Sequence, residues 1–499
     1  MSAPLEPSRE LRHNLRVKGR DRMNRWTCVS RWFFGAIASA YMLGGGLPGL
    51  HDVRGIDAPT ASPSRQQTEG SAFPNAYYDS LLNGLQVILV QRPEASEAIM
   101  SLMIKSGAVF DRAGKSGTAA LTARAIWLGA EDLSGATLRQ RLAALEATIH
   151  TDVTWDSTTI TVEAPARSLP ELIRLMARVV SRPTFEAEAV AALKAQFLEA
   201  VKAKSGDLSE VADQDWYRAL YHPHPYARPP EGLPEEIAAI TPLDLARHHA
   251  RFFIANNATL VILSPFAPET VMPIVRPNFG AMLKGKIVPP TFLAPAPLQG
   301  VRILIRDLPA APVAHIRLGA FGLERFSDDY VPALVLAEVI RLRLERALSD
   351  IGNPAPRAHC RFDLRTQRGP FLLSLAVPNE HIVPTLRRAL HVLTEMRAAG
   401  PTPEELAEAQ RRWSEQLAPD ALSPRQWVEM LHRIELYGLG RDYVHRFPAR
   451  LRRVTQEDVA RVAEKYLSPQ HLLIVIVGRA QGLADALKDL GTVEVKAGT

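Results

Sequence analysis

Hydrophobic and polar residues alternate in two short segments, each of which follows a glycine turn. The alternating apolar positions are Leu85, Val87 and Leu89 in the first segment and Val301, Ile303 and Ile305 in the second. A period of two residues is typical of β-strands, so each segment predicts a strand. A second apolar run follows at 99–104 and at 314–318 and predicts another strand in each half.

Helical periodicity fills much of the remaining sequence. The stretches Leu169–Val180 and Glu186–Lys204 predict helices. Two further helices begin with a threonine and carry an aspartate three residues later, as in a capping box: Thr241 with Asp244, and Thr455 with Asp458. Each leads into a last apolar strand, at 260–263 and 473–477. Strands grouped with helices, without a regular β-α-β alternation, predict an α+β fold.

Three pairs of segments recur in the same order, which indicates an internal duplication. LLNGLQVILVQRP resembles PLQGVRILIRDLP, PTFEAEAVAALKAQF resembles PTPEELAEAQRRWSEQ, and ITPLDLARHHARFFIANNATLVIL resembles VTQEDVARVAEKYLSPQHLLIVIV. The separations are 216 from Gly84 to Gly300, 218 from Thr184 to Thr402, and 214 from Thr241 to Thr455. We therefore expect two related lobes, at 76–267 and 298–499, joined by a Pro-rich linker at 268–297.

The first 75 residues have the composition of a targeting segment. Eight Lys/Arg face three Asp/Glu in residues 1–31, and an uncharged apolar run follows at 32–43. A run of about twelve residues fits a secretory signal better than a spanning helix, which needs about 20. Residues 1–50 are therefore a predicted signal peptide or membrane anchor, with Met23 as an alternative start, and 51–75 a disordered linker. We expect a periplasmic or secreted protein. If the N-terminal segment is not cleaved, it anchors the protein to the membrane.

Bulk composition excludes several classes of protein. Of the 499 residues, 46% are hydrophobic and 22% charged, as in soluble globular proteins. The net charge of +6 arises largely in the N-terminal segment, and no basic stripe interleaved with aromatics predicts nucleic-acid binding. Cys28 and Cys360 are the two cysteines, too few for a disulfide framework or a cysteine metal cluster.

These segments resemble the pitrilysin/insulinase family of zinc metallopeptidases, the inverzincins. The best matches are LLNGLQVILV, KSGAVFDRAGKSGTAA and ITPLDLARHHARFF, and the resemblance covers about residues 76 to 499. It implies two homologous α/β sandwich lobes that close like a clamshell around a peptide. The glycine-rich frame before the family's zinc motif is present as Gly107, Asp111 and Gly117.

The residues that hold zinc in that family are missing from this frame. The inverted motif needs two histidines one helical turn apart and a glutamate that takes a proton from the metal-bound water. The resemblance places these roles on Ala120, Ala123 and Arg124, and the third ligand on Ala200. The adjacent Glu199 points about 100° away on a helix. Methyl groups and a guanidinium cannot coordinate zinc, so we predict no metal, cofactor or catalytic residue.

A second family element lies in the C-terminal half. In members of that family, an Arg and a Tyr in this half hold the substrate backbone and stabilise the oxyanion. The nearest match begins at Arg343, and the resemblance places the Arg on Ser349 and the Tyr on Pro356. Neither half of the composite site is therefore expected to be competent. For Arg124 the sequence leaves two interpretations open: a surface charge, or a partner for an acid in the former metal pocket.

Other motifs in the sequence carry weaker signals. His222 and His224 lie in a Pro-rich loop without a carboxylate cluster, and we expect packing or surface roles. The tripeptide at 114–116 resembles the end of a phosphate-binding loop, but Val109 stands where a glycine is needed. Cys360 lacks a suitably placed base and is expected to be a small buried residue.

The sequence thus predicts a catalytically inactive insulinase-like homologue, not an enzyme, that is the heterodimer partner of an active zinc peptidase homologue or a peptide-binding clamshell. One alternative is an active zinc metalloendopeptidase with a displaced or partner-shared metal site. Another is a structural scaffold subunit of a membrane complex. The peptide bound, the partner's identity and signal cleavage are not determined by the sequence.

Overall fold

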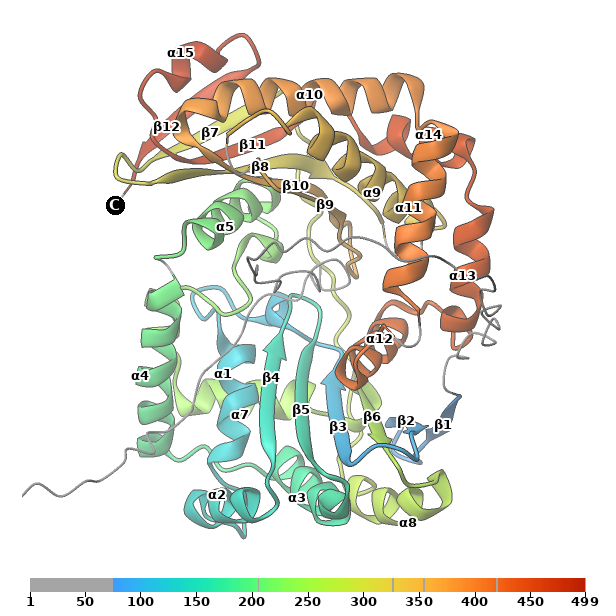
Figure 1. Cartoon of the computed structure of the whole chain (residues 1–499). Helices are drawn as coiled ribbons and strands as arrows, with labels where there is room; N and C mark the ends of the chain where they lie inside the picture. The colour runs from blue at the N-terminus through green and yellow to red at the C-terminus, as the bar shows by residue number, and fades with distance from the viewer. Residues whose placement is uncertain (1–74, 205, 325–326, 353–354, 419–420, 499) are drawn as a thin grey trace, which may run out of the picture.

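The computed structural model describes residues 75–204, 206–324, 327–352, 355–418 and 421–498. Two lobes lie one above the other, each built on a sheet flanked by helices (Figure 1). The predicted signal or anchor at 1–50, the alternative start at Met23 and nearly all of the predicted linker at 51–75 lie outside these residues. The two-lobed α/β architecture is confirmed.

The N-terminal lobe contains a mixed sheet with the strand order β1-β2-β6-β3-β5-β4. β2 and β6 are parallel, and the other neighbours are antiparallel. The strands span Ala76–Ser80 (β1), Gln86–Gln91 (β2), Glu97–Ile104 (β3), Thr148–Val153 (β4), Thr158–Pro165 (β5) and Ala258–Ser264 (β6). The helices span Thr118–Ala125 (α1), Gly135–Ala144 (α2), Leu169–Ser181 (α3), Ala187–Lys204 (α4), Leu208–Tyr221 (α5), Pro234–Ala238 (α6), Pro242–Phe252 (α7) and Pro268–Phe279 (α8).

The C-terminal lobe repeats this plan with the strand order β12-β7-β11-β8-β10-β9. Its strands span Arg302–Asp307 (β7), Val313–Phe321 (β8), Ala358–Phe362 (β9), Pro370–Pro378 (β10), Leu473–Gly478 (β11) and Thr492–Ala497 (β12). Its helices span Tyr330–Ala347 (α9), Ile382–Ala399 (α10), Pro403–Gln416 (α11), Pro424–Tyr437 (α12), Tyr443–Arg453 (α13), Gln456–Tyr466 (α14) and Leu483–Leu487 (α15). The outermost strand comes from a different part of the chain in the two lobes. β1 directly precedes β2, whereas β12 is the last strand in the sequence.

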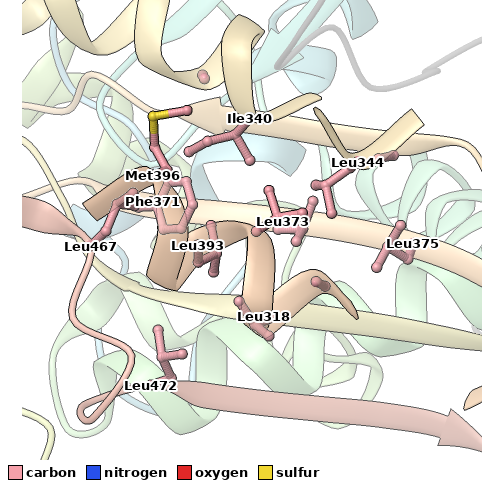
Figure 2. Packing of buried hydrophobic residues seen from close by; sticks show 14 of the residues in the cluster. Leu318, Ile340, Leu344, Phe371, Leu373, Leu375, Leu393, Met396, Leu467 and Leu472 are labelled. Atoms are coloured by element: carbon pink, nitrogen blue, oxygen red, sulfur yellow. The ribbon is translucent and has the colours of Figure 1, made fainter. Parts of the chain in front are cut away.

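The duplicated segments form equivalent elements in the two lobes. β2 and β7 both have six residues and differ by 216 in number at each end. Both predicted capping boxes are formed, by Thr241 with Asp244 on α7 and by Thr455 with Asp458 on α14. The C-terminal core packs strand residues such as Leu318 and Phe371 against helix residues such as Ile340 and Met396 (Figure 2).

Helix α8 corrects the predicted position of the interlobe linker. Residues 268–279, expected to be part of an extended connector, form a helix that buries Val271, Val275 and Phe279 in the N-terminal core. The sequence predicted a linker here because the segment contains three prolines, which usually argue against a helix. Pro268 occupies the first helical turn, where no N–H is needed, and Pro273 and Pro277 lie one turn apart on the exposed face. The segment without regular structure starts after this helix and ends before β7.

The two halves exchange one helix across the molecule. One face of each sheet is covered by helices of its own half, for example α3 and α8 over the N-terminal sheet and α9 and α10 over the C-terminal sheet. The other face receives a helix from the opposite half: α5 lies against the C-terminal sheet, and α12 lies against β3 and β6 (Figure 1). Both helices have 14 residues and differ by 216 in number. The lobes are therefore joined by two reciprocal packing surfaces.

None of the helices in the described ranges combines the length and the apolar character that a membrane-crossing segment requires.

Candidate functional site

The glycine-rich frame before α1 is a structural cap. The Asp111 carboxylate accepts hydrogen bonds from the backbone N–H groups of Gly117, at 2.8 Å, and Ala119, at 2.9 Å. These are donors that the first turn of a helix leaves unpaired. Gly117 has φ of 91°, and a Cβ there would lie 2.6 Å from the carbonyl oxygen of Glu231, so no other residue fits. Burial raises the pKa of Asp111 to about 7. The frame thus positions α1 without any metal.

Ala120 and Ala123 are fully buried on α1. The resemblance assigns these two positions to a metal-binding histidine and to the glutamate base. Ala120 packs with Val190 and Phe197 of α4, and Ala123 packs in the main N-terminal core. Their methyl groups fill space between close neighbours. The helix face that carries the metal ligands in the resemblance is therefore used for apolar packing.

Arg124, at the second histidine position, is half-buried beside α4. Its Nη1 donates a hydrogen bond to the Ala120 carbonyl at 2.8 Å, and its guanidinium carbon lies 4.6 Å from the centroid of the Phe197 ring. No carboxylate of the described residues lies within ion-pair distance of it. Its charge nonetheless lowers the pKa of Asp152 on β4, which desolvation raises. Arg124 is thus neither a fully exposed surface charge nor the ion-pair partner of a described acid.

Ala200, at the third ligand position, lies on α4, which packs against α1. The neighbouring Glu199 is 73% exposed and bonds Lys202 at 3.0 Å. This exposure and the contact with Lys202 agree with the expectation that Glu199 points about 100° away from the Ala200 position. No group of three metal-binding side chains occurs within the described ranges. Three methyl groups and a fixed cation do not fit a divalent metal ion.

The second family element is engaged in structural contacts. Arg343 on α9 binds the Glu405 carboxylate, with Nη2 to Oε2 at 2.7 Å, and also donates to the Gly400 carbonyl. Ser349 bonds the Arg346 carbonyl just after α9, and Pro356 is buried. Pro356 has no donor, and the hydrogen bonds of the Arg343 and Ser349 side chains go to Glu405, Gly400 and Arg346 of the C-terminal lobe. Arg343 holds α9 to the start of α11.

The histidine loop serves packing between the lobes. His224 is buried, accepts the Tyr226 N–H at Nδ1 and contacts Gln367 Oε1 through Nε2 at 2.6 Å. His222 is exposed. The expected packing and surface roles are confirmed for these two side chains. Cys360 is half-buried on β9, and burial raises the pKa of its thiol, which keeps it unreactive.

Strand β4 presents an open edge beside α1. It pairs with β5 along its whole length, and no other described strand pairs with its second edge. α1 packs against β4, and the charge of Arg124 acts on Asp152, the residue before the last of that strand. An open edge can accept an extended peptide as an additional strand. Sequence reasoning missed Asp152, because the polar run TIHTD gives no motif and its place at the edge is set by pairing.

Two family models match the chain. Residues 86–232 match the model described as "Insulinase (Peptidase family M16)", and residues 239–412 match "Peptidase M16 inactive domain". The chain belongs to the insulinase family, peptidase family M16.

Relatives within the insulinase family include peptidase subunits and a protein named as lacking activity. The chain is 22% identical over 437 residues to the probable mitochondrial-processing peptidase subunit beta of Schizosaccharomyces pombe, covering 83% of this chain and 94% of that one. It is 22% identical over 423 residues to an uncharacterized zinc protease of Mycobacterium tuberculosis, covering 82% and 94%. It is 21% identical over 240 residues to the non-peptidase homolog YmxG of Helicobacter pylori, covering 48% and 55%.

Solved structures of insulinase-family proteins share the fold. The crystal structure titled peptidase M16 inactive domain from Pseudomonas fluorescens has a TM-score of 0.74 and 23% identity, covering 81% of this chain and 98% of that chain. The two lobes thus account for almost all of that crystallised protein. This chain keeps the architecture of the insulinase family, while the residues at the positions that the resemblance assigns to zinc ligands do not fit zinc.

Proposed function

We propose that this chain is a non-catalytic member of the insulinase family that acts as the partner subunit of an active homologue. The observation that carries the proposal is the filling of the metal site: Ala120, Ala123 and Ala200 supply methyl groups, and Arg124 supplies a fixed cation. A zinc-activated water needs ligands and a base that these side chains cannot provide.

The partner role is supported by the names of the relatives. Two kinds are relevant: beta subunits of a processing peptidase, which belong to an assembly of more than one chain, and a non-peptidase homolog. A complete two-lobed body that does no chemistry can still cover or stabilise a catalytic chain. A heterodimer with a zinc-bearing homologue is therefore the proposed assembly.

Binding of extended peptides is the second part of the proposal. A peptide added to the open edge of β4 lies next to Arg124 and Asp152. These two side chains carry opposite charges but form no ion pair with each other. Backbone hydrogen bonds along the strand supply affinity, and the two charges supply selectivity. Arg124→Glu is expected to change which peptides bind by reversing the charge next to β4.

We also propose that the protein is exported. The support is the basic leader and the apolar run at 32–43, which have the composition of a secretory signal or a membrane anchor.

Metal analysis and a cleavage assay test the inactive state. The full chain, purified without chelator and supplied with zinc, is expected to hold no stoichiometric zinc and to cleave none of a fluorogenic peptide set. An insulinase-family peptidase with an intact zinc motif, handled in parallel, shows that both assays work. Stoichiometric zinc together with chelator-sensitive cleavage would favour an active enzyme with a displaced site and overturn the proposal.

Affinity purification of the tagged chain from its own cells tests the partner role. Co-purification of a homologue with an intact H-x-x-E-H motif is the expected result. Recovery in a membrane complex without such a homologue would support the scaffold alternative. Cleavage that appears only when both chains are mixed, and that is lost in Arg124→Glu, would place part of a shared site on this chain.

A further inference from the structure

A basic pocket lies between α5 and the C-terminal sheet, away from the former metal site. Its volume is about 310 Å³. Residues of β7, β11, β12 and α5 line it, with His222 at the end of α5. On β7 the lining side chains Arg302, Leu304 and Arg306 alternate, so they project from one face of the sheet toward the helix.

Positive charge exceeds negative charge in this pocket. Four cations line it: Arg218, Arg302, Arg306 and Lys496. Two carboxylates are paired with members of this group: Asp215, which lines the pocket, and Glu494. The net charge of these six groups is therefore +2, in a space with walls formed in part by Leu304, Ala219 and Val475.

The four cations differ in how closely protein carboxylates pair with them. Arg306 is held by Asp215 through two hydrogen bonds of 2.6 and 2.7 Å. Arg218 lies 3.7 Å from the same carboxylate, beyond hydrogen-bond distance, and Lys496 lies 3.3 Å from Glu494. Arg302 forms no ion pair with any residue of the described ranges. The guanidinium groups of Arg218 and Arg302 are therefore available to a ligand.

The N-terminal lobe provides an internal control for this pocket. At the offset of 216 that relates β2 to β7 and α12 to α5, the counterparts of Arg302 and Arg306 are Gln86 and Val90, and those of Asp215 and Arg218 are Leu431 and Ile434. In that lobe Val90, Leu431 and Ile434 form a closed apolar cluster. The architecture therefore packs well without charges here, and the cations of the C-terminal lobe are not required by the fold.

We propose that this pocket binds a phosphate group. A phosphate monoester carries a charge of about −1.5 to −2 at neutral pH, which matches the excess of positive charge. Arginine guanidinium groups bind phosphate oxygens through paired, charge-assisted hydrogen bonds. The phosphate belongs either to free inorganic phosphate or to a small organic monoester, whose carbon atoms can contact Leu304 and Val475.

Calorimetric titration of the full chain tests the proposal and separates the two sources. Inorganic phosphate and butyl phosphate are titrated at pH 7, with sodium chloride at equal ionic strength as the reference. The expected result is saturable binding of one phosphate per chain. Tighter binding of butyl phosphate identifies an organic monoester as the ligand, whereas equal or tighter binding of inorganic phosphate identifies the free ion.

Two pocket variants and one control locate the binding. Arg302→Gln, which introduces the side chain of the counterpart Gln86, is expected to weaken binding about tenfold through loss of a charge-assisted contact. Lys496→Gln provides an independent measurement if the first variant unfolds. Arg452→Gln removes an exposed arginine of α13 and is expected to leave binding unchanged. Absence of saturable binding, or an equal loss of affinity in all three variants, would overturn the proposal.

Discussion

The helices α5 and α12 occupy equivalent places, but they hold the opposite lobe by different interactions. α12 packs Trp427, Leu431 and Ile434 against apolar residues of β2, β3 and β6. α5 also packs aromatic residues, yet it adds ion pairs to the C-terminal sheet: Asp213 with Arg317 at 2.5 Å and Asp215 with Arg306 at 2.6 Å. One interface is therefore largely apolar, and the other is partly ionic.

The difference shows that this architecture does not prescribe the chemistry of its interfaces. Apolar packing is non-directional and depends on area and fit. Buried ion pairs are directional, and their strength comes mainly from the penalty of separating them. One of these pairs, Asp215 with Arg306, also lines the basic pocket. Changes at the two helices should therefore have unequal and distinguishable effects.

Trp427→Ala is expected to give the largest effect. Trp427 is fully buried between α12 and the N-terminal sheet, and truncation of such a side chain costs about 3 to 5 kcal/mol. The free energy of unfolding, measured by urea titration with circular dichroism, should fall by this amount. Leu82→Ala, at a fully exposed side chain, is the control and should change it little. A loss below about 1 kcal/mol would show that α12 does not hold the lobe by packing.

Arg317→Ala should reduce the free energy of unfolding by about 3 kcal/mol, since it leaves the Asp213 carboxylate unpaired in the α5 interface. The double variant Arg317→Met with Asp213→Leu should recover much of this loss, because apolar residues can replace a buried ion pair. A double-variant cycle by urea titration measures the coupling. A double variant that is less stable than Arg317→Ala would contradict an ionic interface of this kind.

His432 should make the α12 interface sensitive to acid. Its Nε2 lies 3.0 Å from Ser101 Oγ, and burial lowers its pKa to about 3. The pKa of this histidine in the folded protein lies below its value in the unfolded chain, which is near 6.5. As the pH falls from 6.5 toward 3, the unfolded chain binds the proton while the folded protein does not, so the free energy of unfolding decreases. From pH 7 to pH 5 the His432 contribution should fall by about 2 kcal/mol.

His432→Gln keeps a hydrogen-bonding group next to Ser101 and should remove that part of the pH dependence. The buried His248, whose pKa is also lowered to about 3, is present in both proteins and cancels in the difference. Urea titrations at pH 7 and pH 5 provide the measurement. Parallel pH profiles for the two proteins would show that His432 does not titrate on unfolding.

Glu435→Gln should give the smallest effect, below about 0.5 kcal/mol. Glu435 on α12 lies 3.7 Å from Lys105, and both side chains are partly exposed. Thermal melts at low and at high salt measure the difference. A loss comparable to that of Arg317→Ala would mean that the α12 interface also depends on charge.

Much of the fold could be predicted from the sequence because its signals are local. Strand alternation, the glycine turns and both capping boxes act over a few residues, and the offset near 216 connects the two lobes. The frame of the candidate site is equally local, because Asp111 caps the first turn of α1 through Gly117 and Ala119. The assignment of zinc positions to Ala120, Ala123 and Arg124 within this frame stays a prediction. Helix α8 was missed, because Pro273 and Pro277 count against a helix unless their shared exposed face is known.

By itself the sequence determined the two lobes and their duplication, because side-chain types and short spacings carry that information; it also predicted that zinc ligands are missing from the frame before α1. Tertiary structure alone decided which helix crosses to which sheet, where Asp152 stands relative to Arg124, and that Arg218 and Arg302 share a pocket. These arrangements join residues far apart in the chain. They depend on long-range packing, which no local pattern in the sequence specifies.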